Sequence, residues 1–226
     1  MKIFYDIDTQ NDFMNENGAL YVPDAKLIKP NLELITDFAR KNFIPLIGSV
    51  DKHFGTEEYK HREGELAKNG GSFPDHCMDE TKGQEKIVET TWDEQIGHGE
   101  YRNLDIFIPQ RLDNKISWKE INWNWSLVKN KQIYFEKQSY DVFTNPSFQV
   151  FLEQAKINEA VVYGVATDYC VKAAVLGMQQ RRIQCYVVED AIKGVFPDKT
   201  KEALEEMAKA GAKFVTTKDV LEGRII

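Results

Sequence analysis

Short apolar runs alternate with longer helical patterns along this chain. The run at residues 160–166 (Ala-Val-Val-Tyr-Gly-Val-Ala) is short and rich in β-branched side chains, which predicts a buried strand. The stretch that follows repeats apolar residues every three or four positions, which predicts a helix. The same patterns predict strands at residues 2–8, 45–50, 132–136, 160–166, 184–189 and 213–216, and helices near residues 27–42, 145–156, 168–182 and 198–210. Such alternation is typical of crossover units, so we expect an α/β fold of three layers, with a mainly parallel β-sheet and helices on both faces.

The middle of the chain, at about residues 55–131, breaks this alternation. It is polar and irregular, and it contains all four tryptophans, Trp92, Trp118, Trp123 and Trp125. We expect site-building loops here rather than a second domain. The sequence therefore predicts a single domain over residues 1–226 with a long Trp-rich insertion at about residues 88–128, which could serve as a lid, a specificity loop or a subunit contact.

Composition narrows the class of partner. The formal net charge of −7 argues against nucleic acid or an anionic membrane as the main partner. No apolar run approaches the ~20 residues of a membrane span, and the first residues resemble a strand rather than a signal peptide. The three cysteines are odd in number and lack paired spacing, which favours a reducing cytoplasm over a disulfide framework. We expect a cytoplasmic protein that acts on a small molecule, and a homo-oligomer stays open.

Reactive side chains follow several of the predicted strands. Asp8 ends the first strand, Lys137 follows the third, and Cys170 lies just after the strand at residues 160–166, in the first turn of a helix. Ligands of open parallel sheets bind beyond the carboxyl ends of the strands, where neighbouring ends lie close together. A free cysteine is most often only a small buried hydrophobe. The convergence of the three strand ends, rather than the cysteine alone, predicts a site.

Asp8, Lys137 and Cys170 together have the chemistry of nucleophilic catalysis. The positive end of the helix and the lysine ammonium would lower the pKa of the thiol toward the reactive thiolate. Asp8 could take the thiol proton, pass it to a leaving group and then activate water. Since no histidine is placed as the base, the arrangement differs from that of cysteine–histidine proteases.

A second set of residues has the side chains of a metal site. Asp51 and His53 are two apart in an extended segment and so point the same way. His76 is the best third ligand, and Glu63 is the first choice for a fourth. The alternatives for that fourth position are Glu57, Glu58 and Glu65. Mixed nitrogen and oxygen ligands suit one divalent ion, zinc, manganese or iron, and an incomplete shell leaves room for water or substrate.

Several segments match one family together. They are residues 7–13 (Ile-Asp-Thr-Gln-Asn-Asp-Phe), 18–23 (Gly-Ala-Leu-Tyr-Val-Pro), 51–53, 73–77 (Phe-Pro-Asp-His-Cys), 137–143 and 189–191. The strongest is residues 164–172, Gly-Val-Ala-Thr-Asp-Tyr-Cys-Val-Lys. On these motifs the chain resembles the nicotinamidases of the isochorismatase-like cysteine hydrolases. Residues 88–128 are longer and more Trp-rich than a compact member of that family.

This resemblance implies hydrolysis of nicotinamide to nicotinate and ammonia, a step of NAD salvage, through a thioester on Cys170. It implies a catalytic triad of Asp8, Lys137 and Cys170, and a metal held by Asp51, His53 and His76, with zinc as the expected ion. Glu63 stays a candidate, because the fourth protein ligand varies within the family.

The resemblance also implies how the substrate is held. A cis peptide bond between Val165 and Ala166 would direct the Ala166 N–H, together with that of Cys170, at the oxyanion of a tetrahedral intermediate. The metal would bind the pyridine nitrogen. The aromatic residues that would enclose the ring are Phe13, Phe73, Tyr140 and Tyr169.

Other functions stay open at this point. Another amidase of the same superfamily would act on a ureido or aliphatic amide, although such relatives typically lack the metal loops. An isochorismatase is a weaker candidate, because that branch lacks the cysteine. A non-catalytic metal-binding interaction protein would use the Trp-rich insertion as its partner surface. A redox sensor would need a resolving cysteine, and only Cys77 could reach Cys170.

Overall fold

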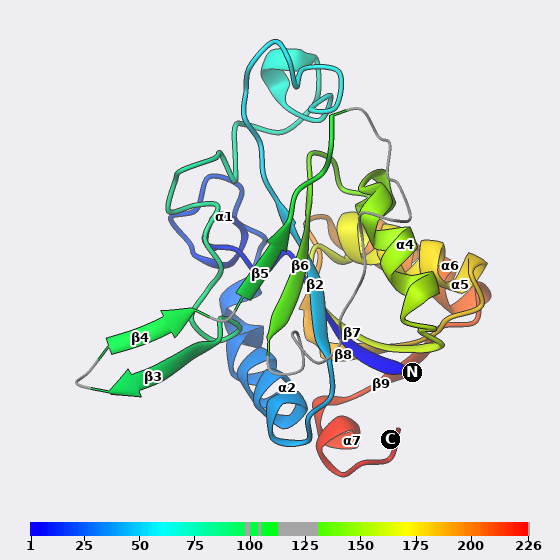
Figure 1. Cartoon of the computed structure of the whole chain (residues 1–226). Coiled ribbons are helices and arrows are strands. Elements are labelled where there is room, and N and C mark those ends of the chain that lie inside the picture. The colour runs from blue at the N-terminus through cyan, green and yellow to red at the C-terminus, as the bar shows by residue number, and fades with distance from the viewer. Residues whose placement is uncertain (98–99, 104, 113–130, 226) are drawn as a thin grey trace.

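The computed structural model describes residues 1–97, 100–103, 105–112 and 131–225. Its centre is a seven-stranded sheet in the order β5-β6-β2-β1-β7-β8-β9, in which every neighbouring pair is parallel (Figure 1). The strands are β1 (Lys2–Ile7), β2 (Leu46–Asp51), β5 (Asp105–Ile108), β6 (Gln132–Lys137), β7 (Glu159–Val165), β8 (Gln184–Lys193) and β9 (Lys213–Val215). A separate antiparallel hairpin, β3 (Asp93–Gly97) and β4 (Glu100–Asn103), projects away from this sheet.

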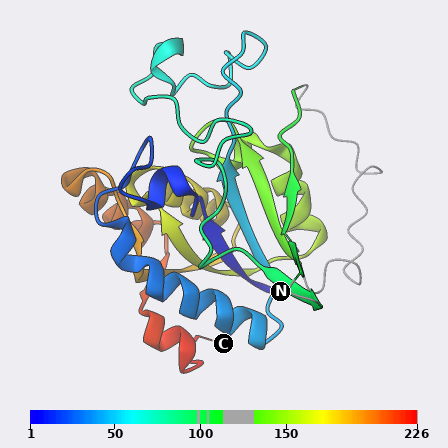
Figure 2. The ribbon, with the colours of Figure 1, turned by 90° about the vertical axis from the view of Figure 1, so that its left-hand side faces the viewer.

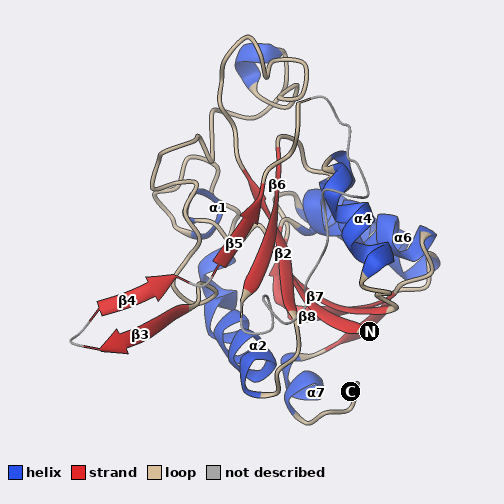
Figure 3. Ribbon diagram, viewed as in Figure 1, coloured by secondary structure: helices blue, strands red, loops and turns tan. Residues whose placement is uncertain are grey.

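Helices cover both faces of the sheet, as the coloured view of helices and strands makes plain (Figure 3). On one face lie α4 (Pro146–Gln154), α5 (Lys172–Gln180) and α6 (Pro197–Lys209), and on the other lie α2 (Lys29–Lys41) and α7 (Thr217–Leu221). The shorter elements are α1 (Asn11–Met14), the 3₁₀ turns η1 (Ala25–Ile28), η2 (Ala67–Asn69) and η3 (Val142–Thr144), and a π-helical turn, η4 (Thr167–Val171). The three-layer α/β architecture expected from the alternating pattern is confirmed.

The central strand β1 shows why the sheet needs two covering layers. Ile3, Tyr5 and Ile7 point to one face and pack with α4 and α5, whereas Phe4 points to the other and packs with α2. All four side chains are fully buried. Strands that are apolar on both faces are typical of parallel sheets between two helical layers. No described helix has the length and apolar character needed to cross a membrane.

The connections create one place where a site can form. From β1 the chain moves outward through β2 to β5 and β6, and then returns to the other side of β1 with β7. The carboxyl ends of β1, β2, β6 and β7 therefore meet around the point where the strand order reverses, which is where open α/β sheets bind ligands. The loops between β2 and β3 lie over this end of the sheet, opposite the two chain termini (Figure 2).

The predicted elements differ from the observed ones mainly in the middle of the chain. Residues 105–108, placed by the sequence within the insertion, form the edge strand β5 of the main sheet. The hairpin of β3 and β4 and the short helix α7 were not predicted. The helix predicted from residue 168 begins instead with the π-helical turn η4 and becomes α-helical at Lys172. Trp118, Trp123 and Trp125 lie outside the described residues.

A buried ion pair fastens the loop after the metal candidates to the sheet. Lys86 Nζ lies 2.6 Å from Asp6 Oδ2 and 2.7 Å from Thr9 Oγ1, and it sits over the Tyr134 ring at 4.2 Å. The Lys86 and Asp6 side chains are 2% and 1% exposed. A pair this deeply buried destabilises the fold if one partner is removed, because the other charge is left without compensation.

Candidate active site

Cys170 is held by a tight junction between β7 and α5. Gly164, near the end of β7, has a φ of 118° and lies so close to β1 that a Cβ atom would stand 2.1 Å from the Ile7 carbonyl oxygen. Only glycine fits that position. The next peptide bond but one, between Val165 and Ala166, is cis, as the resemblance implies. The π-helical turn η4 follows and carries the Cys170 side chain, 8% exposed, to the pocket floor.

Lys137 joins the three strand ends that the sequence singles out. Its fully buried Nζ atom lies 2.8 Å from Asp8 Oδ2 and 3.6 Å from Cys170 Sγ, and it also pairs with Asp51 Oδ1. Asp8 follows β1 in a left-handed conformation with a φ of 50°, and Ser49 Oγ donates a hydrogen bond of 2.8 Å to its other oxygen. The structure therefore brings Asp8, Lys137 and Cys170 together around one ammonium.

Burial sets the protonation of this group. It raises the pKa of the Cys170 thiol well above its ordinary value, and the Lys137 ammonium offsets this only in part because Asp8 and Asp51 carry negative charge nearby. Burial likewise raises the pKa of Asp8 against the opposing effect of Lys137. For Lys137 burial lowers the pKa, but the carboxylates of Asp51 and Asp8 outweigh it and raise the pKa well above the usual value.

The expected lowering of the thiol pKa is therefore wrong for this structure. The sequence shows the lysine and the helix end, but it does not show that Cys170 is enclosed and faces two carboxylates. The thiol whose pKa burial raises has the Asp8 carboxyl group within reach. One oxygen of each carboxylate, Asp8 and Asp51, lies within 4.8 Å of Cys170 Sγ. A base that removes the proton during attack fits this arrangement better than a preformed thiolate.

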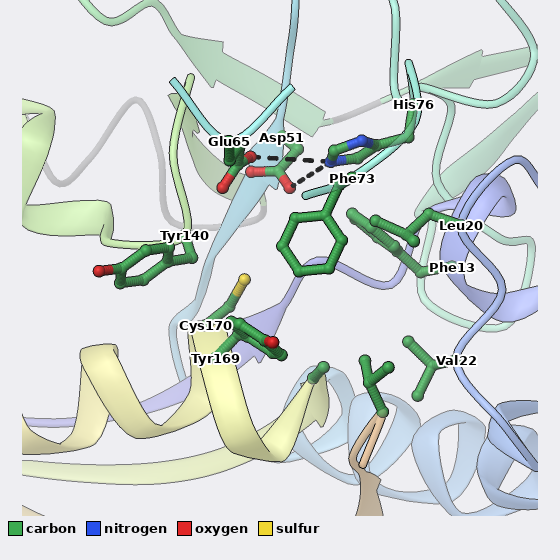
Figure 4. Close-up of a pocket in the computed structure, with 12 residues that line it drawn as sticks. Phe13, Leu20, Val22, Asp51, Glu65, Phe73, His76, Tyr140, Tyr169 and Cys170 are labelled. Carbon is green, nitrogen blue, oxygen red and sulfur yellow. Dashed lines mark ion pairs between the residues drawn. The ribbon is translucent and has the colours of Figure 1, made fainter. Parts of the chain in front are cut away.

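Four metal-ligand side chains meet beside this group: Asp51, His53, Glu65 and His76. One ligand atom from each lies within 4.8 Å of all the others. His53 Nε2 is 3.1 Å from Glu65 Oε1. His76 Nε2 is 3.7 Å from the same oxygen and 3.8 Å from Asp51 Oδ2 (Figure 4). The three ligands expected from the sequence thus lie together.

Glu63, the first choice for a fourth ligand, is replaced in this group by Glu65, one of its alternatives. The Glu63 carboxylate accepts hydrogen bonds from the backbone N–H groups of Phe54 (2.6 Å) and Gly55 (3.0 Å). Its Oε1 atom also faces Nδ1 of His53 at 3.7 Å, on the side of the ring away from the group. Glu63 therefore stands behind His53, where it can orient the ring.

The donor set fits a divalent cation. Both ring nitrogens of His53, a fully buried residue, face carboxylate oxygens, of Glu63 and of Glu65. Neither nitrogen forms a well-aligned hydrogen bond among the described residues. His76 Nδ1 donates to the Pro74 carbonyl at 2.7 Å, which leaves Nε2 as the free ligand atom. Burial lowers the pKa of His76, but hydrogen bonds to Asp51 and Glu65 outweigh it and raise the pKa to about 10. Carboxylates that stabilise an imidazolium here would equally stabilise a metal ion, and two imidazoles with two carboxylates suit zinc.

Two polar residues of the family-like segment at residues 7–13 hold the metal candidates in place. The Gln10 amide clamps the Asp51 backbone, with Nε2 2.7 Å from its carbonyl oxygen and Oε1 2.7 Å from its nitrogen. The Asp12 carboxylate accepts from the backbone N–H groups of Cys77 (2.7 Å) and Ala19 (2.9 Å). The sequence did not single out these two for a role, because their partners are distant backbone atoms that no spacing reveals.

The pocket above Cys170 is largely apolar (Figure 4). All four aromatic residues expected to enclose a ring line it, and Phe73 and Tyr169 meet edge to face at 5.2 Å. Tyr140 is 49% exposed and stands at the mouth, whereas Phe13 is 6% exposed. The remaining lining residues are Leu20, Val22, Asp51, Glu65, His76, Ala166, Cys170 and Val195. Leu20, Val22 and Val195 were not predicted, because an apolar loop residue carries no signal of its own.

Comparisons with known proteins show which family contains this chain. The isochorismatase domain model matches residues 106–219, half of the chain. The chain belongs to the isochorismatase family. This isochorismatase-family chain is 29% identical over 217 residues to the nicotinamidase of Escherichia coli (strain K12), covering 94% of this chain and 93% of that protein.

One more distant sequence relative and one solved structure match a similar share of the chain. The nicotinamidase of Saccharomyces cerevisiae (strain ATCC 204508 / S288c) is 23% identical over 229 residues, with 91% of this isochorismatase-family chain and 96% of the yeast protein covered. The crystal structure of the pyrazinamidase of Pyrococcus horikoshii in complex with zinc matches with a TM-score of 0.70 at 23% identity, covering 95% of this chain and 98% of that one. The family's fold and this structure agree along nearly the whole length.

Proposed function

We propose that this protein hydrolyses nicotinamide to nicotinate and ammonia through a thioester on Cys170. The observation that carries the proposal is one buried ammonium, Lys137, which contacts Asp8, Cys170 and Asp51 at once. It joins a nucleophile and a base to a group of metal ligands on the wall of the same pocket. The nicotinamidases of Escherichia coli and Saccharomyces cerevisiae, similar over more than nine-tenths of the chain, support the choice of substrate.

Acylation begins with the proton of the Cys170 thiol. Asp8 takes it as the sulfur attacks the amide carbon, and Lys137 stabilises the negative charge that shifts between them. Asp8 then delivers the proton to the departing nitrogen, so the C–N bond breaks and ammonia leaves. The products of this half-reaction are a thioester on Cys170 and a carboxylate on Asp8, ready for water.

Deacylation uses the same base. Asp8 takes a proton from a water molecule that attacks the thioester carbon, and the C–S bond breaks to release the carboxylic acid. The sulfur recovers its proton from Asp8. The backbone N–H groups of Ala166 and Cys170 would stabilise the oxyanion of both tetrahedral intermediates, an interaction worth about 3–4 kcal/mol per donor in other acyl-transfer enzymes.

A divalent cation would be held by Asp51, His53, Glu65 and His76. When bound, it supplies a Lewis acid for the lone pair of the pyridine nitrogen. The zinc bound by the Pyrococcus horikoshii pyrazinamidase supports zinc as the ion. The chain itself would orient the ring between Phe73, Tyr169 and Phe13, which line the pocket.

Ammonia release from a panel of amides tests the proposal. We expect turnover of nicotinamide, weak turnover of benzamide, which has the same shape without the ring nitrogen, and none of an aliphatic amide or a carbamoylated amine. A chelator should remove most of the activity, and added zinc should restore it. Preference for an aliphatic or ureido substrate by a metal-free enzyme would favour the rival amidase, and no release from any amide would favour a non-catalytic binding protein.

Zinc binding by two matched variants, Glu65→Gln and Glu63→Gln, tests which glutamate is the fourth ligand. Glu65→Gln should lower the affinity for zinc by more than the ~10- to 100-fold that is typical of losing an outer-shell partner, because it removes a charge that binds the ion directly. Glu63→Gln should change affinity less, since Glu63 acts only through the His53 ring and nearby backbone. The reverse order of the two variants would return the fourth position to Glu63.

A further inference from the structure

Asp168 links the nucleophile's turn to a neighbouring loop that lines the pocket. It lies in η4, two residues before Cys170, and is 5% exposed. Its Oδ1 atom accepts a hydrogen bond from the Val195 N–H (2.9 Å), and its Oδ2 atom accepts one from the Phe196 N–H (3.0 Å). Both carboxylate oxygens are thus committed to the short loop between β8 and α6.

That loop is pressed against the carboxylate. A Cβ atom added to Gly194 would stand 1.9 Å from Thr200 Oγ1 and 3.0 Å from Asp168 Oδ1, so no side chain fits between the loop and its anchor. The residue after this glycine is Val195, which lines the pocket with Ala166 and Cys170. Hydrogen bonds to a charged acceptor are shorter and stronger than those between neutral groups. Two of them fix both the position and the orientation of the loop that contains Val195.

We propose that Asp168 is a positioning residue that sets the Val195 wall at a fixed distance from Cys170 and thereby decides which ring substituents the pocket admits. The inference rests on the proposed function for its substrate, a six-membered aromatic amide. Asp168 contributes to specificity through the loop, because its described side-chain hydrogen bonds go to that loop and not to Asp8 or Lys137.

Asp168→Asn tests this coupling. An amide can accept one of the two N–H groups but presents its own NH₂ to the other, so the loop must move away. We expect the KM for nicotinamide to rise about 10-fold with a smaller fall in kcat, because uniform binding of the ring is lost. The ratio of kcat/KM for a ring-methylated nicotinamide over nicotinamide should rise. Val195→Ala should raise the same ratio. The double variant should raise the ratio by less than the product of the two single fold-changes.

Two further measurements complete the test. Asp190→Asn is the matched control, because Asp190 also anchors a chain segment, accepting from Thr217 N (2.7 Å) and Thr217 Oγ1 (2.8 Å) away from the pocket. It should leave the substrate ratio at the parental value. The second measurement needs no turnover: alkylation of Cys170 by a bulky maleimide relative to iodoacetamide should increase in both Asp168→Asn and Val195→Ala.

The outcomes separate this inference from the proposed function. If the parent protein releases no ammonia from nicotinamide, the proposed function fails, and the alkylation ratio alone decides the role of Asp168. If Asp168→Asn lowers thermal stability but leaves both ratios at parental values, Asp168 is merely structural and the inference is overturned. Fully independent effects of the Asp168 and Val195 substitutions would overturn it as well.

Discussion

Cys170→Ala should lower nicotinamide turnover by about 10⁴-fold or more, a loss of the size seen when other covalent enzymes lose their nucleophile. No other described thiol can replace it, because Cys77 and Cys185 are fully buried and neither lines the pocket. The variant should bind as much divalent metal as the parent protein, since the four candidate ligand side chains are untouched. Initial rates of ammonia release and metal analysis of the same preparation provide the measurement.

Cys185→Ala is the control for this substitution. Cys185 lies in β8 within the apolar core, with its sulfur near the carbonyl oxygens of Val175 and Ile183. Its loss should cost a little stability and leave turnover near the parental rate. Near-parental turnover by Cys170→Ala would exclude Cys170 as the nucleophile.

Asp8→Asn should lower kcat by about 10²- to 10⁴-fold, the contribution typical of a positioned general base. The amide has the shape of the carboxylate but cannot take the thiol proton, and burial raises the pKa of the Cys170 thiol. The fold should survive, because Lys137 retains its ion pair with Asp51. Steady-state kinetics measure the fall in kcat. Alkylation of Cys170 should not slow, because the negative charge of Asp8 raises the pKa of the thiol and its loss lowers that pKa.

A matched substitution two residues earlier, in β1, separates base chemistry from burial. Asp6→Asn also removes a buried carboxylate, but one that pairs with Lys86 rather than with Lys137. It should lower the free energy of unfolding by about 3–5 kcal/mol, the cost of leaving a buried charge without its partner, with kcat changed far less than in Asp8→Asn. Equal kcat losses in the two variants would argue against Asp8 as the base.

The fold could be predicted where the pattern is strong and local. The apolar runs that become β1 and β7 are fully buried. Because strands of a parallel sheet are buried on both faces, a continuous apolar run is enough to predict them. The edge strand β5 is only four residues long. Its apolar run, Ile106 to Ile108, lies within an otherwise polar stretch and is too short to be distinguished from a loop by its pattern. The π-helical turn η4 has the sequence of an ordinary helix start, and its hydrogen bonding is decided by packing.

The site could be predicted where it follows from topology. Asp8, Lys137 and Cys170 end or follow strands that a parallel sheet must bring together, and the structure has them in contact. Glu63 and Glu65 are separated only by Gly64, and the course of the loop decides which of them faces the ligand group. The high thiol pKa and the link from Asp168 to Val195 depend on burial and on a contact between distant segments, which a sequence pattern does not contain.

The chemistry of Cys170 can be observed by quenching the enzyme in acid during turnover of nicotinamide and mapping its peptides by mass spectrometry. A thioester that forms through attack by this sulfur predicts a nicotinoyl group on the peptide that contains Cys170, absent in Cys170→Ala and in unreacted protein. Steady turnover with no acyl group on that peptide, or with the group on Cys77 or Cys185, would contradict the mechanism.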